Sequence, residues 1–428
     1  MVVARPTPEP PSPLKADVAV VGGGIIGLGI AHEVRRRGRS VVLIDPAPAS
    51  GATFAAAGML APVSELHYQE EDLLELMLES SLLWPAFASS LAQDATATGY
   101  RTTATLAIGA DAADRRALAD LRNVQLAAGL LVDPLSLREA REREPLLSPQ
   151  ISCAFDIPAD HQVDPRKVAE CLMSGLDAHE PGDHTWVSGT EYGYRVTATA
   201  TRLRWDEGRV CGVELDSGVV VQAGETVLAN GLGAARLHGL PAGLNLPLRP
   251  VYGDILRLKV PRHLQPLVTS TIRGVVRGVP VYIVPRDDGT VVIGATQRED
   301  GLSAPSNAVS AGGVYQLLRD AQALVPAVAE LELVEATARA RPGTPDNAPL
   351  LGRVCGPEGR ADGLVIATGF FRHGVLLTPA TARIVGGLIE GKEDPRWAIF
   401  RPDRFATDTT RAGTHAPADI DAPRKETV

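Results

Sequence analysis

The sequence predicts an α/β fold in which a doubly wound parallel sheet, assembled from separate stretches of the chain, is joined to an antiparallel sheet with helices. Three observations support this prediction. A strand, a glycine-rich turn, a helix and a second strand follow one another near the N-terminus. Similar apolar strands, typical of burial on both faces, return near the middle and the end of the chain. Between them, alternating segments with short glycine-containing turns indicate antiparallel hairpins.

Composition excludes several classes of protein. The chain has 428 residues, a length typical of two or three domains, and 45% of them are apolar, so extensive disorder is excluded. The formal charge of −9 argues against a nucleic acid as partner. The four cysteines, Cys153, Cys171, Cys211 and Cys355, form no C-x-x-C pair. We therefore expect reduced thiols and no metal site.

The two ends of the chain are predicted to be disordered. Residues 1–14 contain five prolines, and residues 407–428 are rich in small and polar side chains. The most apolar early stretch, residues 18–31, is 14 residues long and contains five glycines. This length is too short to cross a bilayer, so we expect no membrane span and a cytoplasmic location.

The first motif is a complete dinucleotide-binding unit. Residues 16–21 form the first strand, the pattern Gly22-x-Gly24-x-x-Gly27 opens a helix, and residues 40–44 form a second strand that ends at Asp45. Gly22 permits the tight turn, Gly24 allows a pyrophosphate to approach the backbone, and Gly27 allows the helix to pack closely on the sheet. The helix N-terminus offers free N–H groups to phosphate, and Asp45 is placed to bind ribose hydroxyls. The unit therefore predicts a Rossmann-like domain, and the alternative is a glycine-rich turn that binds nothing.

The remaining elements follow from periodicity and turn residues. We expect helices at 70–99, 112–129, from Pro165 onward, at 307–324 and at 375–390, and strands or hairpins at 195–221, 226–229, 248–260, 280–296 and 363–368. The strands that look buried on both faces assign residues 15–65, 147–240 and 335–400 to the nucleotide-binding domain. Residues 66–146 and 241–334 then form the substrate-binding domain.

A run of small residues at 51–62 follows the second strand directly. Small side chains allow close approach of an extended ligand, although the same run is compatible with a packed, alanine-rich turn. No second G-x-G-x-x-G follows a later strand, which argues against reductases that bind two dinucleotides.

Taken together, five stretches make the chain resemble the glycine oxidase (ThiO-type) branch of the FAD-dependent D-amino acid oxidase family over about residues 16–400. They are residues 20–27 with Asp45, 56–62 (AAGMLAP), 282–286 (YIVPR) with 294–296, 341–346 (RPGTPD) and 367–379 (ATGFFRHGVLLTP). The resemblance implies a noncovalent FAD, because Arg339 occupies the position of the linking cysteine of sarcosine-oxidase-like relatives. It implies cofactor contacts from Gly22, Gly24, Ile25, Ile26, Gly27, Asp45, Pro46, Ala52, Thr53, Ala57, Gly58, Met59, Gly369, Phe370, Phe371, Arg372, His373, Gly374 and Val375.

The resemblance also implies three substrate-binding residues. Arg341 matches the arginine that binds the substrate carboxylate, because a planar guanidinium binds a carboxylate in bidentate fashion. Tyr282 matches a hydroxyl that reaches the same carboxylate, and Arg372 matches a second arginine near the substrate. Without the motifs, Arg341 reads as a surface residue, Arg372 as a solvated cap and Tyr282 as a core residue. Phe370 and His373 depart from the family pattern, in which a polar ring and an amide are common.

The activity implied is oxidation of glycine or another small amino acid by dioxygen, with formation of hydrogen peroxide and an imine. No side-chain base is required, so no catalytic residue is assigned beyond the flavin itself. Alternatives are a sarcosine or D-amino acid oxidase or dehydrogenase, and an inactive flavin-binding partner subunit. A homo-oligomer and a hand-off of the imine to thiazole-synthesis enzymes of thiamine biosynthesis are open partner hypotheses.

Overall fold

The computed structural model describes residues 13–68, 70–92, 95–178, 194–299, 307–356 and 359–406. The first twelve residues of the expected lead 1–14, and the whole expected tail 407–428, lie outside these ranges. Among the described helices, none combines the length and the hydrophobicity that crossing a membrane requires.

The first sheet contains the dinucleotide motif and has the strand order β17-β18-β11-β1-β2-β8, with β10 and β9 attached beside β11. The pairs β18–β11, β11–β1, β1–β2 and β2–β8 are parallel. Val21 lies opposite both Ile44 and Leu228, so the ends of β1, β2 and β11 meet at one edge of the sheet. The strands are β1 (Leu14–Val21), β2 (Val41–Ile44), β8 (Arg195–Val196), β9 (Ala200–Asp206), β10 (Arg209–Leu215), β11 (Val220–Leu228), β17 (Leu350–Gly356) and β18 (Gly359–Thr368).

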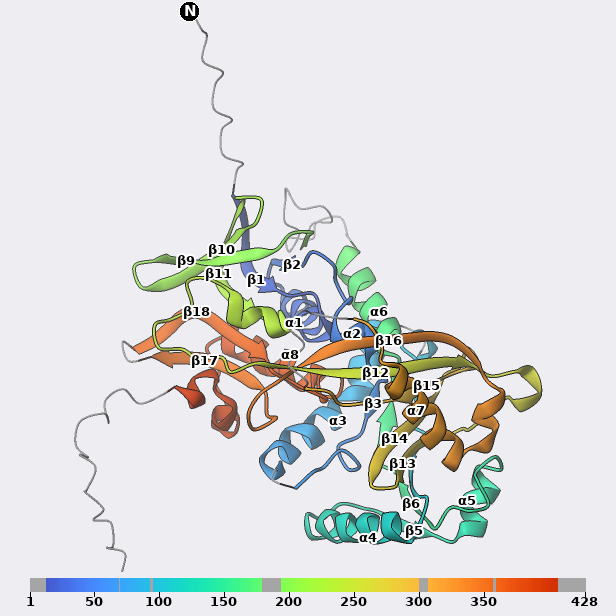
Figure 1. The fold of residues 1–428 in the computed structure, drawn as a ribbon. Helices are drawn as coiled ribbons and strands as arrows, with labels where there is room; N and C mark the ends of the chain where they lie inside the picture. Colours follow the sequence, from blue (N-terminus) through green and yellow to red (C-terminus); the bar gives the residue numbers. More distant parts are fainter. Residues whose placement is uncertain are drawn as a thin grey trace, which may run out of the picture.

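The second sheet is mostly antiparallel and has the order β16-β12-β15-β14-β13-β4-β6-β5, with one parallel pair between β13 and β4. Its longest strands, β12 and β16, run side by side from the lobe of the first sheet into the second lobe (Figure 1). The strands are β4 (Thr105–Gly109), β5 (Asp133–Leu135), β6 (Cys153–Ile157), β12 (Arg249–Lys259), β13 (Thr271–Val276), β14 (Val279–Pro285), β15 (Thr290–Gly294) and β16 (Glu332–Gly343). A two-stranded sheet of β3 (Met59–Leu60) and β7 (His161–Gln162) lies apart from both.

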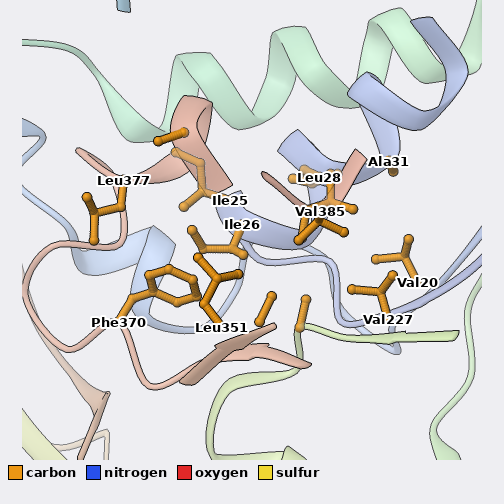
Figure 2. Close-up of a cluster of buried hydrophobic side chains, with 14 of the residues drawn as sticks. Val20, Ile25, Ile26, Leu28, Ala31, Val227, Leu351, Phe370, Leu377 and Val385 are labelled. Atoms are coloured by element: carbon orange, nitrogen blue, oxygen red, sulfur yellow. The ribbon is translucent and has the colours of Figure 1, made fainter. Parts of the chain in front are cut away.

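Helices cover the first sheet on the face that carries the largest core. Side chains of α1, α3, α6 and α8 pack there against Val18, Val20 and Val227 of the parallel strands. Figure 2 shows part of this core, with Phe370 beside Ile26 and Leu351. The helices are α1 (Ile25–Arg36), α2 (Ala52–Ala55), α3 (Glu71–Leu91), α4 (Ala112–Ala127), α5 (Leu137–Arg143), α6 (Pro165–Asp177), α7 (Ala311–Leu324) and α8 (Thr378–Ile389), with 3₁₀ turns η1 (Ala95–Ala97), η2 (Gly231–Arg236), η3 (Arg262–Leu264), η4 (Pro326–Glu330), η5 (Pro395–Phe400) and η6 (Pro402–Phe405).

Local signals placed several element boundaries. The side chain of Asp164 caps α6 by accepting from Arg166 N at 3.0 Å, and Pro165 occupies the first helical position. Gly38, with φ +76°, ends α1. The helix expected at 375–390 begins at Thr378, three residues later than predicted.

Three expected domain boundaries do not follow the sheets and the cores packed on them. Strand β6 lies inside the segment 147–240 that we assigned to the nucleotide-binding domain, yet it pairs with β4 in the second sheet. Strand β16 overlaps the segment 335–400 and pairs with β12, also in the second sheet. Helix α3, placed with the substrate-binding segment 66–146, packs in the core of the first sheet. An apolar run has the same appearance in either sheet, and only long-range pairing decides its membership.

Candidate functional site

The glycine turn has the geometry that its spacing predicts. Gly22 has φ +107°, and a Cβ there would lie 2.6 Å from the carbonyl carbon of Ala229. A Cβ on Gly27 would overlap the carbonyl oxygen of Gly22, so the start of α1 packs directly on the turn. At Gly24 the nearest atom to such a Cβ is Thr53 Oγ1 at 3.6 Å, so the turn is open on this side. The space beside Gly24 therefore suits a ligand that approaches the backbone.

Asp45 connects the glycine turn to the segment after β2. Its carboxylate accepts a hydrogen bond from Gly23 N at 2.6 Å and another from Ala47 N at 2.7 Å. Thr53 Oγ1 accepts from Ile25 N at 3.0 Å, which is the first N–H of α1. These bonds fix the turn, α1 and α2 relative to one another.

One cavity of about 510 Å³ extends from this turn to the second sheet. Its lining includes the following residues that the sequence predicted: Gly22, Gly24, Ile25, Ile26, Asp45, Ala52, Thr53, Ala57, Gly58, Met59, Tyr282, Arg341, Phe370, Phe371, Arg372, His373, Gly374 and Val375. Three predicted cofactor residues, Gly27, Pro46 and Gly369, are not in the lining. Gly27 packs on Gly22, and a Cβ on Gly369 would lie 2.7 Å from Thr344 Cγ2, so both face protein.

Tyr282 and Arg341 come from nearby strands of the second sheet, where the order is β14-β15-β12-β16. The Tyr282 hydroxyl lies against Gly294, and the Arg341 guanidinium lies against Gly253. A Cβ added to either glycine would overlap the side chain that lies on it. Arg341 is half-buried, and among the described residues its guanidinium makes no hydrogen bond and no ion pair. Burial raises the pKa of the Tyr282 hydroxyl, although Arg341 opposes this, so the phenol keeps its proton. Both groups are available as hydrogen-bond donors to an anion.

Arg372, in contrast, is held by two carboxylates. Its Nη2 pairs with Glu70, and its Nε lies 3.1 Å from Glu65 Oε2. Glu65 also pairs with Arg273, and Glu70 accepts from Asn347 Nδ2 at 2.9 Å. Burial alone would raise the pKa of Glu65, but Arg273 and Arg372 lower the pKa to about 2. The two arginines and the two glutamates therefore balance one another inside the fold.

Sequence reasoning missed Glu65 and Arg273, which both line the cavity, and Glu70. The available signal for Arg273 was weak: a single charge within the apolar strand β13. The β13–β14 register places Arg273 directly opposite Tyr282, which no spacing in the sequence reveals.

Among the described residues of the cavity lining, three buried polar atoms make no hydrogen bond: His373 Nε2, Asn230 Oδ1 and Arg372 Nε, the last of which is ion-paired with Glu65. Burial, reinforced by Arg372, lowers the pKa of His373 to about 3, so the imidazole is neutral. Phe370 is 4% exposed and belongs to the core of the first sheet as well as to the cavity (Figure 2). The orphaned atoms and the open glycine turn fit an extended ligand with phosphates and polar ring edges, as FAD has.

A protein-family profile described as FAD dependent oxidoreductase matches residues 17–388, which is most of the chain. The chain belongs to this family.

Individual relatives of this FAD-dependent oxidoreductase agree with the family assignment. It is 31% identical over 405 residues to the bifunctional protein ThiO/ThiG of Trichormus variabilis, an alignment that covers 94% of this chain and 57% of that protein. The chain thus spans a little over half the length of this relative. It is 34% identical over 388 residues to glycine oxidase of Geobacillus kaustophilus, covering 88% of this chain and 93% of that protein. The crystal structure of glycine oxidase from Geobacillus kaustophilus matches with a TM-score of 0.78 at 31% identity, over 91% of this chain and 99% of that chain.

These findings confirm the predicted fold class, the FAD cofactor and the oxidoreductase class. The individual cofactor and substrate contacts remain proposals.

Proposed function

We propose that this oxidoreductase oxidises glycine or another small amino acid at the end of the cavity that Arg341 and Tyr282 line. The observation that carries the proposal is Arg341, a half-buried guanidinium without an acidic partner among the described residues. A carboxylate is the anion whose two oxygens match a guanidinium edge. The glycine oxidase of Geobacillus kaustophilus, at 34% identity, supports this substrate class.

The site residues bind and orient the substrate. Arg341 holds the carboxylate through two N–H groups, and the Tyr282 hydroxyl donates to the same group, so the α-carbon and its amine are directed toward the cofactor. Asp45, the glycine turn and the segments 52–59 and 370–375 would hold the FAD. The cofactor would supply the two-electron acceptor for the substrate α-carbon, with dioxygen as the final oxidant and hydrogen peroxide as its product. Because the free amine needs no side-chain base, the protein contributes to the reaction mainly by positioning the substrate against the cofactor.

The balance of charge in the cavity favours a substrate with one carboxylate. Arg273 and Arg372 are neutralised by Glu65 and Glu70, which leaves Arg339 and Arg341 as the cavity arginines without an ion pair among the described residues. Arg339 donates to Ser50 O, Thr337 Oγ1 and Ala338 O, so the guanidinium of Arg341 is the one with its donors free for a substrate carboxylate. A second carboxylate on the substrate would approach the buried, ionised Glu65 and be repelled. Small neutral side chains, as in glycine, sarcosine or D-alanine, satisfy this condition.

The product imine has two fates in the proposal. Water converts it to the 2-oxo acid and ammonia, or the intact imine passes to the enzymes that build the thiazole of thiamine. The ThiO/ThiG relative supports the second fate, because its name joins two functions in one chain. A sarcosine or D-amino acid oxidase or dehydrogenase is the alternative within the same chemistry, and an inactive flavin-binding subunit is the alternative outside it.

A substrate panel on the purified protein tests the proposal. Glycine, sarcosine, N-ethylglycine, D-alanine and D-proline are mixed anaerobically with the holoenzyme, and bleaching of the flavin is followed before air is admitted. We expect glycine or a close analogue to bleach the flavin and to yield peroxide in air. Bleaching without reoxidation in air would indicate a dehydrogenase, and no bleaching by any amine would favour the inactive subunit.

A further inference from the structure

The backbone of residues 54–57 begins in helix α2 and runs along the cavity, and arginines bind three of its four carbonyl groups. Arg166 Nε donates to Phe54 O at 2.9 Å, and Arg257 Nη2 lies 3.4 Å from Phe54 O and 3.5 Å from Ala56 O. Arg286 Nη2 donates to Ala57 O, and its Nη1 donates to Val163 O at 2.9 Å. Guanidinium groups therefore hold three carbonyls within four residues.

These arginines come from both lobes. Arg166 is on α6, Arg257 lies in β12 and Arg286 directly follows β14 of the second sheet, so α2 is held between α6 and the second sheet (Figure 1). The side chains of Arg257 and Arg286 are 10% and 6% exposed. Two carboxylates pair with them: Glu335 with Arg166 at 2.6 Å, and Asp164 at 3.7 Å from Arg286 Nε. Asp287 and Asp288 also act on Arg286, more weakly than Asp164. The guanidinium groups, and not these acids, contact the carbonyls, so positive charge lies directly behind this backbone.

Burial, with a contribution from Arg257, lowers the pKa of Arg286 to about 10. The group therefore remains protonated at neutral pH and keeps its charge in the interior.

The opposite edge of the same backbone is free. In a planar trans peptide the N–H points away from the C=O, so carbonyls turned toward the arginines direct the N–H groups of Ala57 and Gly58 the other way. No hydrogen bond within the described part of the chain uses either N–H. Both residues line the cavity. Buried N–H groups without a partner in the protein are rare, and here they are placed where a ligand can accept from them.

We infer that Arg166, Arg257 and Arg286 are positioning residues for the cofactor: they hold the carbonyl side of residues 54–57, turn the N–H edge toward the cavity and bring positive charge behind it. Reduction adds negative charge to a flavin, and nearby positive charge stabilises that state. The arginines therefore raise the reduction potential of the bound FAD as well as its affinity. The inference uses the proposed placement of FAD along residues 52–59, and it requires no particular substrate.

Arg286→Met removes the donors and the charge while keeping a flexible, unbranched apolar stem. In the holoenzyme we expect a lower midpoint potential of the FAD, measured by reductive titration against a redox dye. We also expect FAD to dissociate with a Kd at least about tenfold higher, the value of a single hydrogen bond to a charged group. Arg286→Lys, which keeps a charge and some donors, should restore part of both quantities.

Arg353→Met is the matched control. Arg353 is 5% exposed, donates to Leu388 O at 2.8 Å and pairs with Glu225 at 2.8 Å, but it does not line the cavity. The Arg353→Met variant should have a lower Tm and an unchanged midpoint potential of the FAD. If Arg286→Met lowers Tm while potential and Kd stay at wild-type values, as in the control, the arginines are merely structural and the inference is wrong.

Arg166→Met, on the more exposed helix α6, decides in the same way if Arg286→Met does not fold. The midpoint potential, the Kd of FAD and Tm are all measured without an amino acid. They therefore test this inference even if the substrate panel contradicts the proposed function.

Discussion

Replacing Arg341 separates substrate binding from every other role in this cavity. The side chain lies on Gly253 and makes no ion pair within the described part of the chain, so Arg341→Ala breaks no internal contact of that kind. Each hydrogen bond to a charged group contributes about 1.5–3 kcal/mol. Because Arg341 is half-buried and partly screened by solvent, we take about 2–3 kcal/mol for the bidentate pair. This corresponds to about a 30- to 150-fold loss of affinity.

Glycolate gives the cleanest assay, because it keeps the carboxylate and lacks the oxidisable amine. Its Kd, measured from the perturbation of the flavin spectrum, should rise by that factor in Arg341→Ala and by less in Arg341→Lys, which lacks the planar fork. The KM for glycine should rise in parallel, while FAD content and Tm stay near wild type. Arg138→Ala, at a side chain that is 85% exposed on α5, is the control and should change nothing. If Arg341→Ala binds glycolate with wild-type affinity, the carboxylate is held elsewhere and the reasoning fails.

Three further predictions concern the cofactor and the buried charges. Asp45→Ala should raise the Kd of FAD about tenfold or more, because the carboxylate that faces the cavity also fixes the glycine turn; an unchanged Kd in a fluorescence titration would remove Asp45 from the site. Acid precipitation should release FAD into the supernatant, because Arg339 and no cysteine lines this part of the cavity, and flavin that stays with the polypeptide would contradict this. The pKa of Glu65 is lowered in the folded state to about 2, so its pairing stabilises the fold above about pH 4.5 and is lost as pH falls toward 2, a contribution of about 3 kcal/mol. Thermal unfolding at pH 2–5 should therefore depend less on pH in Glu65→Gln than in the wild type, and equal slopes would exclude this role.

The dinucleotide-binding unit could be predicted from the sequence because its determinants are local. Gly22, Gly27 and Asp45 follow one another within a single strand-helix-strand unit, and steric contact between neighbouring segments dictates their identity. The strand β6 could not be assigned correctly for the opposite reason. Its partner β4 lies more than forty residues earlier, and nothing in the run CAFDI distinguishes one sheet from the other.

The charged residues of the cavity could not be predicted from the sequence for the same reason, because their partners are distant along the chain. Glu65 and Arg273 belong to no motif, and they meet only because β13 and the segment after β3 reach the same cavity. Gly253 also carries no signal in the sequence, and Gly294, although it belongs to the stretch 294–296 that supports the family resemblance, does not reveal its steric role there. That role is visible only when the fold places the Arg341 guanidinium on Gly253 and the Tyr282 hydroxyl on Gly294.

Arg341 and Arg372 illustrate what the fold adds to a motif. Both were assigned to the substrate on the same kind of evidence, and both line the cavity. Their partners differ, because Glu65 and Glu70 balance the charge of Arg372 and no carboxylate in the described part of the chain balances that of Arg341. Removing Arg372 would leave a buried glutamate without its cation, so its loss should act on stability as well as on activity. Removing Arg341 deprives only the substrate carboxylate of its cationic partner. Arginine therefore has a structural role at position 372 and a binding role at position 341. The difference arises because the fold places glutamates beside Arg372 and, among the described residues, none beside Arg341.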